Sequence, residues 1–294
     1  MNTQLDTSKL DDLNTAPAGK PSGGRIVAIA SGKGGVGKTS LTLNLARAAS
    51  KNGHKVLVFD GDLGLANVDV QLGLTPGKDL SAVIAGKANL ADIVSTAQNA
   101  GFDVIPGRSG SETLPFTTAL ERHDILKQLQ TLAASYDLVL LDVAAGVGEE
   151  VLTFASMANT TLLVVTPDPS SITDGYAVIK LLNKRYRKNN CQILINQPGT
   201  ALEGRKTYEK IKVAADKFLG LDVPLFGVVP YDKNYLTAVR QQSLLVDSFP
   251  HEKSAESLLE MANSLVKDSE VKDSGVKDSG ARDSRAKDLG QDAK

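Results

Sequence analysis

The sequence predicts an α/β fold built on a mostly parallel twisted sheet of about seven to eight strands, with helices on both faces. Short apolar runs rich in β-branched residues alternate with longer segments of helical periodicity. The apolar runs are nearly continuous, which is typical of parallel strands that are covered on both faces. They lie at residues 25–31, 55–60, 102–106, 137–142, 161–168, 192–196 and 225–230.

The first strand and the helix after it show the repeating unit of this fold. A helix is expected after residues 25–31, because Leu41, Leu45 and Ala48 recur on one face. It is expected to end before Gly53, since glycine accepts the left-handed conformation that closes many helices. Repeated strand–helix–strand units form right-handed crossovers and a parallel sheet, so ligands are expected at the carboxyl ends of the strands.

A single domain is expected between two polar ends of the chain. Residues 1–24 are rich in Asp, Thr, Pro and Gly and predict a flexible leader. Residues 266–294 repeat with a period of five, as in VKDSE, VKDSG and ARDSR. This period matches neither helix nor strand and forms no continuous apolar face, so a disordered tail is predicted. The domain is therefore expected to span residues 25–265.

Composition narrows the functional classes. Lys and Arg total 33 against 34 Asp and Glu, so the formal net charge of -1 provides no overall positive field for nucleic acid or acidic lipid. Cys191 is the only cysteine, and His54, His123 and His251 are far apart, which argues against a disulfide framework and a His/Cys metal site. We expect a cytoplasmic protein, because the N-terminus has no signal-peptide core and no apolar run approaches about 20 residues.

The first predicted strand leads directly into a glycine-rich motif. The segment from Gly32 to Thr39 matches G-x-x-x-x-G-K-[ST] between a strand and a helix. In such a loop, backbone N–H groups point at phosphate, Lys38 reaches the β and γ phosphates, and the Thr39 hydroxyl faces Mg²⁺. The alternative is a glycine turn that only packs helix against strand. The predicted ATP-binding segment comprises Gly32, Lys33, Gly34, Gly35, Val36, Gly37, Lys38, Thr39 and Ser40.

A second lysine, Lys33, precedes Lys38 within the same loop. The run KGGVGKT resembles the deviant Walker A signature of the MinD/ParA ATPases, which implies a MinD-like P-loop NTPase fold. In that family the extra lysine crosses to the partner subunit's nucleotide. The resemblance therefore implies a homodimer when ATP is bound, with Lys33 acting in trans as an arginine finger does. Judged without the family, a solvated loop lysine is an equal alternative.

Acidic residues follow two predicted strands at the sheet edge that carries the loop. Asp60 and Asp62 follow one strand, and Asp142 ends another in the segment DVAAG. Carboxylates there can hold the hydration shell of Mg²⁺ or orient an attacking water. Aspartates at strand ends are also common turn residues.

The resemblance assigns a role to each of these positions. It implies that Asp60 and Asp142, together with Thr39, lie around Mg²⁺, and that Asp62 positions water as a catalytic residue alongside the two lysines of the loop. It also implies that Gly146 contacts the γ phosphate through its backbone.

Two later strand ends carry residues that could flank the base. An asparagine amide offers a donor and an acceptor together, the pattern of an adenine edge. By resemblance, Asn196, Pro230 and Asp232 surround the adenine, although each taken alone could be a turn former.

One predicted helix has a basic end that could form a binding surface. The segment that starts PSSITDG places Ser171 and Asp174 in capping-box-like spacing. Its basic end is either a solvated helix terminus or a partner or DNA surface. That end contains Lys184, Arg185, Arg187 and Lys188.

The last predicted helix covers residues 255–267. By resemblance, a membrane-binding helix of the family needs an apolar stripe and basic flanks. Leu258, Ala262 and Leu265 share one face, but Glu256 and Glu260 interrupt the pattern. We expect this helix to pack on the domain, which makes membrane association doubtful.

Three longer segments narrow the resemblance, which covers about residues 25–250. DGDLGLANVDVQLGLTPGKDLSAVIAG, SSITDGYAVIKLLNKRY and VPYDKNYLTAVRQQSLLVDSFP are more similar to the FlhG/FleN group than to MinD itself. This implies a slow regulatory ATPase, using ATP and Mg²⁺, that controls flagellar number and placement. The implied partners are an FlhF-type SRP GTPase and a σ54-dependent flagellar activator. The implied location is the cytoplasm, the periphery of the inner membrane or the cell pole.

Single features of the sequence argue against other functions that this fold can support. A ParA-like DNA-associated ATPase or a MinD-like positioning ATPase is the alternative, and the neutral net charge gives no strong DNA-binding signal. Iron–sulfur chemistry needs paired cysteines, and Cys191 is alone. Lys33 and the strand-end carboxylates favour a regulator over a small-molecule synthetase.

Overall fold

The computed structural model describes residues 24–62, 67–107 and 118–267. Within them, eight strands form one sheet in the order β3-β4-β2-β5-β1-β6-β7-β8. Every neighbouring pair is parallel except β3 and β4, which are antiparallel. The strands are β1 Arg25–Ser31, β2 Val56–Gly61, β3 Ser95–Ala97, β4 Phe102–Ile105, β5 Leu138–Ala145, β6 Thr160–Val165, β7 Cys191–Asn196 and β8 Leu225–Val229.

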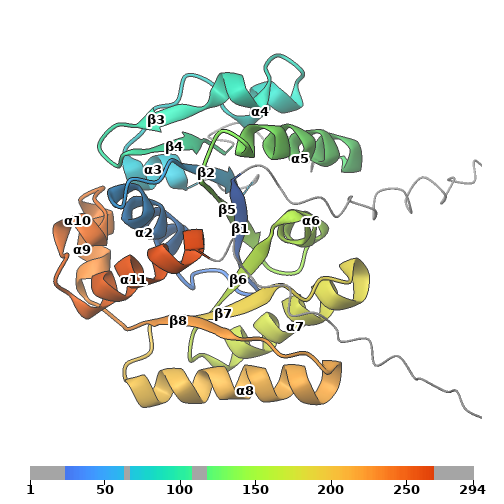
Figure 1. The fold of residues 1–294 in the computed structure, drawn as a ribbon, viewed down its shortest axis with the longest axis vertical. Coiled ribbons are helices and arrows are strands. Elements are labelled where there is room, and N and C mark those ends of the chain that lie inside the picture. Colours follow the sequence, from blue (N-terminus) through green and yellow to red (C-terminus); the bar gives the residue numbers. More distant parts are fainter. Residues whose placement is uncertain (1–23, 63–66, 108–117, 268–294) are drawn as a thin grey trace, which may run out of the picture.

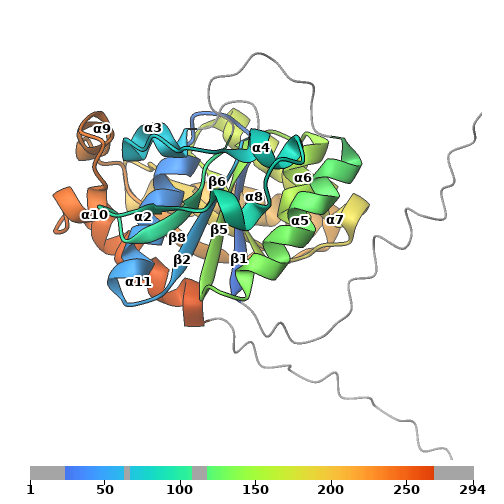
Figure 2. The same ribbon diagram turned by 90° about the horizontal axis from the view of Figure 1, so that it is seen from above.

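Helices cover both faces of this sheet, as Figures 1 and 2 show. Alternation along β1 explains the two layers, because Val27 and Ile29 enter one apolar core while Ile26 and Ala28 enter the other. The first core is completed by α2 Lys38–Lys51, α10 Leu245–Ser248 and α11 Lys253–Lys267. The second is completed by α5 Ala119–Ala133, α6 Glu149–Met157, α7 Pro169–Tyr186 and α8 Ala201–Leu219.

Within the described residues, four short helical segments add to these layers, and Val68, Leu80 and Leu90 from three of them are buried in the two cores. The four segments are α3 Val68–Leu72, α4 Leu80–Ile84, the 3₁₀ helix η2 Leu90–Ile93 and α9 Asn234–Arg240. Helix α3 directly precedes Gly73, which has a φ of 62° and closes the helix. Helix α3 contacts the first turn of α2, where the Ser40 hydroxyl donates to Gln71.

The predicted fold class is confirmed, and the differences from the sequence prediction are local. Strand β3 was not predicted, because three residues, Ser95–Ala97, carry no periodicity. Strand β6 ends at Val165, earlier than predicted, since Pro167 and Pro169 provide no backbone N–H for a ladder. Helix α2 ends at Lys51, and Gly53 has the expected left-handed φ of 86°.

The last helix packs on the domain as predicted. In α11 the side chains of Leu258, Ala262 and Leu265 are buried in the core that α2 shares. The helix continues through Val266 and Lys267, so it includes the first two residues of the five-residue repeat. Residues 1–23 of the expected leader and residues 268–294 of the expected tail lie outside the described residues. Across the described ranges, every helix is too short or too polar to cross a bilayer.

Candidate nucleotide-binding site

The glycine-rich loop joins β1 to α2 at the carboxyl edge of the sheet. Gly35 and Gly37 have φ values of 76° and 92°, in the left-handed region that favours glycine. A Cβ atom at Gly37 would lie 2.7 Å from Asn196 Nδ2, and one at Gly32 would lie 2.3 Å from the backbone carbonyl carbon of Asp174. The glycines are therefore required by the loop's conformation and by its close contact with β7 and α7.

One flank of this loop contains a buried carboxylate whose hydrogen bonding is incomplete. Thr39 Oγ1 donates to Asp142 Oδ2 at 2.5 Å. The other carboxylate oxygen, Oδ1, is buried and has no hydrogen-bond partner within the described part of the chain. Burial raises the pKa of Asp142 to about 6, against the opposing effects of the Lys38 charge and the Thr39 hydrogen bond. A buried oxygen of this kind is costly unless a ligand satisfies it.

A second aspartate lies directly beside Asp142. Asp60 on β2 pairs with Asp142 on β5 in the strand register. Its carboxylate accepts hydrogen bonds from the backbone N–H groups of Asp62, Asn67 and Val68 at 3.1 to 3.2 Å. Burial, and then the neighbouring Asp142, raise the pKa of Asp60 to about 7. The negative charge of Asp62 also raises the pKa of Asp142, which places Asp62 in the same electrostatic neighbourhood.

This oxygen-rich group, Thr39, Asp60 and Asp142, is called the metal flank below. Hydroxyl and carboxylate oxygens are the ligands that Mg²⁺ takes, and the unsatisfied Oδ1 of Asp142 fits a hydrated cation. The described residues contain no group of three His, Cys, Asp or Glu side chains able to hold a metal on their own. Mg²⁺ usually binds one or two carboxylates together with substrate phosphates and waters.

The opposite flank holds Lys33 in a contact within its own chain. Lys33 Nζ lies 2.8 Å from Asp168 Oδ2 and 2.7 Å from Ser170 Oγ. The side chains of Lys33 and Asp168 are 40% and 45% exposed. The Lys33 hydrogen bond, aided by Ser170, holds the pKa of Asp168 well below its usual range. We call Lys33, Asp168 and Ser170 the lysine flank.

The cap of α7 differs from the sequence prediction. Asp168 is the N-cap residue and accepts from the Ser170 backbone N–H at 2.7 Å, with Pro169 in the first turn. The predicted capping pair of Ser171 and Asp174 is wrong, because Ser171 Oγ instead accepts from the Thr166 backbone N–H. The aspartate before a proline at the start of a helix was the sequence signal that would have found this cap.

Gly146 and Asn196, predicted to contact the γ phosphate and the base, each donate a hydrogen bond within the protein. Gly146, with a φ of 108°, donates its N–H to the Ser31 carbonyl at 2.8 Å, so this group already has a protein partner. Asn196 Nδ2 donates to the Val36 carbonyl of the loop at 2.7 Å, while its buried Oδ1 has no partner among the described residues.

The segment after β8 is occupied by structural contacts. Asp232 accepts from the Asn234 backbone N–H at 2.8 Å and from the Ser254 hydroxyl, so both carboxylate oxygens serve α9 and α11. Pro230 is half-buried, and Tyr231 beside it is 63% exposed. The structure thus brings Asn196 to the phosphate loop, whereas the Asp232 carboxylate is engaged elsewhere.

Sequence reasoning missed several residues around a cavity of about 350 Å³ beside the loop. Gln197 lines it with a φ of 61°, an unusual conformation for a residue before proline, which normally is extended. Glu203 of α8 lines the same cavity and accepts from the Gly199 backbone N–H at 2.7 Å. Neither residue lies in a recognisable motif, so only the fold places them at the loop.

The site and the fold define a P-loop nucleotide-binding protein, and the chain belongs to the CobQ/CobB/MinD/ParA nucleotide binding domain family, whose model matches residues 27–246. The predicted kinship with the MinD/ParA ATPases and the FlhG/FleN group is confirmed.

Two individual relatives and one solved structure support this family assignment. The chain is 37% identical to the antiactivator FleN of Pseudomonas aeruginosa over 79% of its own length and 82% of that protein. It is 35% identical to the flagellum site-determining protein YlxH of Helicobacter pylori, over 84% and 83% of the two chains. Its fold matches the septum site-determining protein MinD of Pyrococcus horikoshii, solved with Mg-ADP, with a TM-score of 0.68 and 26% identity over 84% and 98% of the chains.

Proposed function

We propose that this chain is an ATP-dependent dimerising switch that hydrolyses ATP slowly to ADP and phosphate and thereby regulates flagellar number or placement through partner proteins. The observation that carries the proposal is the metal flank. There a buried carboxylate oxygen of Asp142 has no hydrogen-bond partner within the described residues, while the other oxygen accepts from Thr39 of the phosphate-binding segment. Such a group is explained by a ligand that brings both a cation and phosphate.

In this proposal each residue of the loop has a separate task. The backbone of residues 32–40 cradles the phosphates, and Lys38 neutralises the charge of the β and γ groups. Thr39, Asp142 and Asp60 would together hold Mg²⁺ and its waters through their oxygens. Bound Mg²⁺ would offset negative charge on the phosphates. Asp62 orients the attacking water, which is the general requirement of phosphoryl transfer to water.

Recognition of the base is proposed for the far side of the loop. Asn196 Oδ1 is an acceptor without a protein partner among the described residues, and the amino group of adenine is a donor. Pro230 and Gln197 stand at neighbouring strand ends. Asp232 contributes by holding its loop in place through Asn234 and Ser254.

The dimer is proposed from Lys33. In one chain this lysine is half-exposed and bound to the α7 N-terminus by an ion pair of the kind that contributes little free energy. It can therefore exchange Asp168 for a phosphate of the partner's nucleotide at small cost. ATP must favour the dimer more than ADP does for such a switch to work.

The flagellar role rests on the relatives. FleN is an antiactivator and YlxH is a flagellum site-determining protein, and the chain covers more than four-fifths of each. By resemblance, the partners are an FlhF-type GTPase and a σ54-dependent activator, and the site of action is the cytoplasm or the cell pole. The buried face of α11 does not favour membrane attachment through that helix.

Light scattering of Asp62→Ala tests the proposal, because a chain that binds but does not hydrolyse ATP should be trapped in the active state. We expect its mass to double with Mg-ATP and to stay monomeric with Mg-ADP. Asp222→Ala, at an exposed position remote from the loop, is the matched control and should behave as wild type. A monomer under every condition would contradict the dimeric switch.

A further inference from the structure

The short helix α3 links the carboxylates of the site to the rest of the molecule. It follows β2 and is five residues long, Val68–Leu72. The backbone N–H groups of Asn67 and Val68 both donate to Asp60 Oδ2 at 3.1 Å, so the start of α3 is tied to the metal flank. Because so short a helix has little stability of its own, its position depends on surrounding contacts.

One of these contacts joins α3 to the helix of the phosphate loop. Ser40 Oγ, in the first turn of α2, donates to Gln71 Oε1 at 3.0 Å. Ser40 directly follows Thr39, whose hydroxyl contacts Asp142. The hydrogen bond therefore connects α2, which carries Thr39, to α3, whose start is bonded to Asp60.

A second contact fixes the other end of α3 from a distant part of the chain. Gln242 Nε2 donates to the Val70 carbonyl at 3.0 Å. Gln242 has a φ of 49°, a left-handed conformation that persists in non-glycine residues only where surrounding contacts enforce it. A Cβ atom at Gly73 would lie 3.0 Å from Gln242 Oε1, so the glycine that ends α3 also leaves room for this amide.

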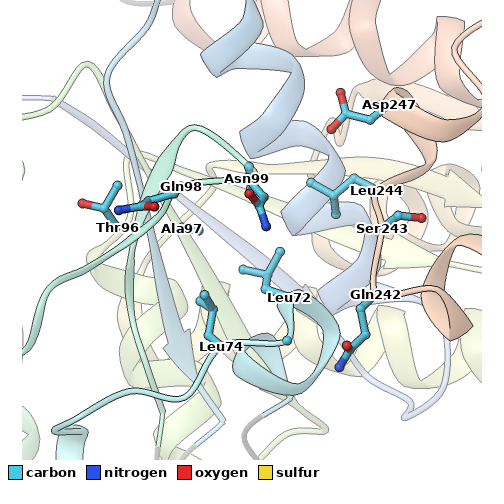
Figure 3. A pocket seen from close by; sticks show the side chains of 12 residues that line it. Leu72, Leu74, Thr96, Ala97, Gln98, Asn99, Gln242, Ser243, Leu244 and Asp247 are labelled. Carbon is cyan, nitrogen blue, oxygen red and sulfur yellow. The ribbon is translucent and has the colours of Figure 1, made fainter.

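The carboxyl end of α3 has an open space beside it. Gln242 and residues Leu72 to Leu74 line a cavity of about 460 Å³ that also borders the β3–β4 turn (Figure 3). On that side Leu72 and Leu74 pack against the apolar core, and the Gln242 amide adds a hydrogen bond to the helix backbone. The Gln71 and Gln242 side chains, bonded to the Ser40 hydroxyl and to the Val70 carbonyl, are together called the clamp on α3.

We propose that Gln71 and Gln242 are positioning residues for ATP hydrolysis, holding α3, and with it the Asp60–Asp62 segment, in register with the phosphate loop. This inference rests on the proposed ATPase function. Gln71 contacts the phosphate-binding segment only through the Ser40 hydroxyl, which leaves the backbone N–H groups of the loop free for phosphate, and Gln242 bonds to α3 alone. Both side chains therefore act through α3. Loosening the clamp should impair the placement of Asp62 for water and leave the phosphate cradle intact.

The test compares turnover with binding in three variants. Gln242→Ala removes the hydrogen bond to Val70, and Gln71→Met removes the one to Ser40 with little change of volume. We expect each to lower kcat about fivefold, the effect of one lost hydrogen bond, with an unchanged dissociation constant for ATP and an unchanged melting temperature. Gln71→Glu keeps an acceptor oxygen for Ser40 and should retain near wild-type turnover.

Gln241→Ala is the matched control, since Gln241 is an exposed neighbour whose side chain makes no hydrogen bond within the described ranges. Unchanged kcat in both Gln242→Ala and Gln71→Met would overturn the inference. A parallel loss of kcat, ATP affinity and melting temperature would overturn it as well, because it would show a merely structural role.

Hydrogen exchange of the α3 backbone separates this inference from the proposed function. Amides of residues 67–72 should exchange about fivefold faster in Gln242→Ala than in wild type or Gln241→Ala. A wild-type chain without ATP turnover would contradict the proposed function, and the exchange rates would still decide whether the clamp exists. Equal exchange in all three proteins would refute it.

Discussion

The two flanks of the phosphate-binding loop differ in how completely a single chain satisfies them. On the lysine flank, Lys33 has both an anionic and a hydroxyl partner and lies at the surface. On the metal flank, Asp142 is 3% exposed and one of its oxygens has no partner among the described residues. The polar groups of the lysine flank are hydrogen-bonded without a ligand. On the metal flank, burial of the Asp142 carboxylate costs free energy that a bound ligand would offset.

This difference suggests which flank controls which step. The metal flank is buried and already assembled, so it should determine whether nucleotide binds at all. The lysine flank is exposed and held by a weak ion pair, so it is free to change partners when a second chain arrives. Substitutions on the two flanks should therefore separate binding from dimerisation.

The largest expected effect distinguishes the two lysines of the loop. Lys38→Ala removes the cation proposed to face the β and γ phosphates and should weaken ATP binding about 10- to 150-fold, as loss of a charged hydrogen bond does. Lys33→Ala should leave the dissociation constant for ATP nearly unchanged in the monomer while it weakens dimerisation and hydrolysis. Calorimetry at protein concentrations below dimer formation measures this directly. An equal loss of ATP affinity in the two variants would remove the distinction between the flanks.

A smaller effect is expected on the stability of the nucleotide-free chain. Asp142→Asn removes a buried charge and should raise the free energy of unfolding by about 1 kcal/mol at pH 8, as relief of a functional-site cost commonly does. The pKa of Asp142 is raised to about 6 in the fold, above its ordinary value of 3.8, so the folded chain binds the proton more tightly. The wild type therefore loses stability as pH rises through this range.

Urea unfolding in EDTA at pH 8 and at pH 5 checks this expectation. The gain in Asp142→Asn should shrink at pH 5, where the wild-type carboxyl in the folded chain is protonated. Asp222→Asn, at an exposed site, should show no gain at either pH. If Asp142→Asn is less stable than wild type at pH 8, the metal flank carries no unsatisfied charge.

The residues around the phosphate-binding loop differ in whether a local sequence pattern marks them. The loop, Asp60 and Asp142 could be predicted as candidates because each lies in a local pattern, a glycine motif or an apolar strand ending in a carboxylate. Asp168 and Gln242 have their contacts 135 and 172 residues away in the chain, with Lys33 and Val70. No local pattern reports such pairs, since only the folded sheet and its connecting loops bring them together.

Short irregular elements escaped prediction for a related reason. Strand β3 and helix α3 span three and five residues and are fixed by pairing with β4 and by bonds to Asp60 and Gln242. Their own periodicity is too brief to be read. The long strands were predictable because burial on both faces of the sheet imposes apolar residues at each position. Helix α2 was predictable because its buried residues Leu41, Leu45 and Ala48 recur on one face.

The smallest expected effect concerns the ion pair of the lysine flank. Asp168→Asn keeps a side-chain oxygen that can cap α7 but removes the charge that holds Lys33. In an Asp62→Ala background, half-maximal dimerisation should then require about two- to threefold less ATP, since an exposed ion pair contributes little. Light scattering across an ATP titration measures the shift, and Asp168→Glu should restore the original requirement. A higher ATP requirement in Asp168→Asn would show instead that Asp168 supports Lys33 within the dimer, and the lysine flank would then be a preassembled part of the active state.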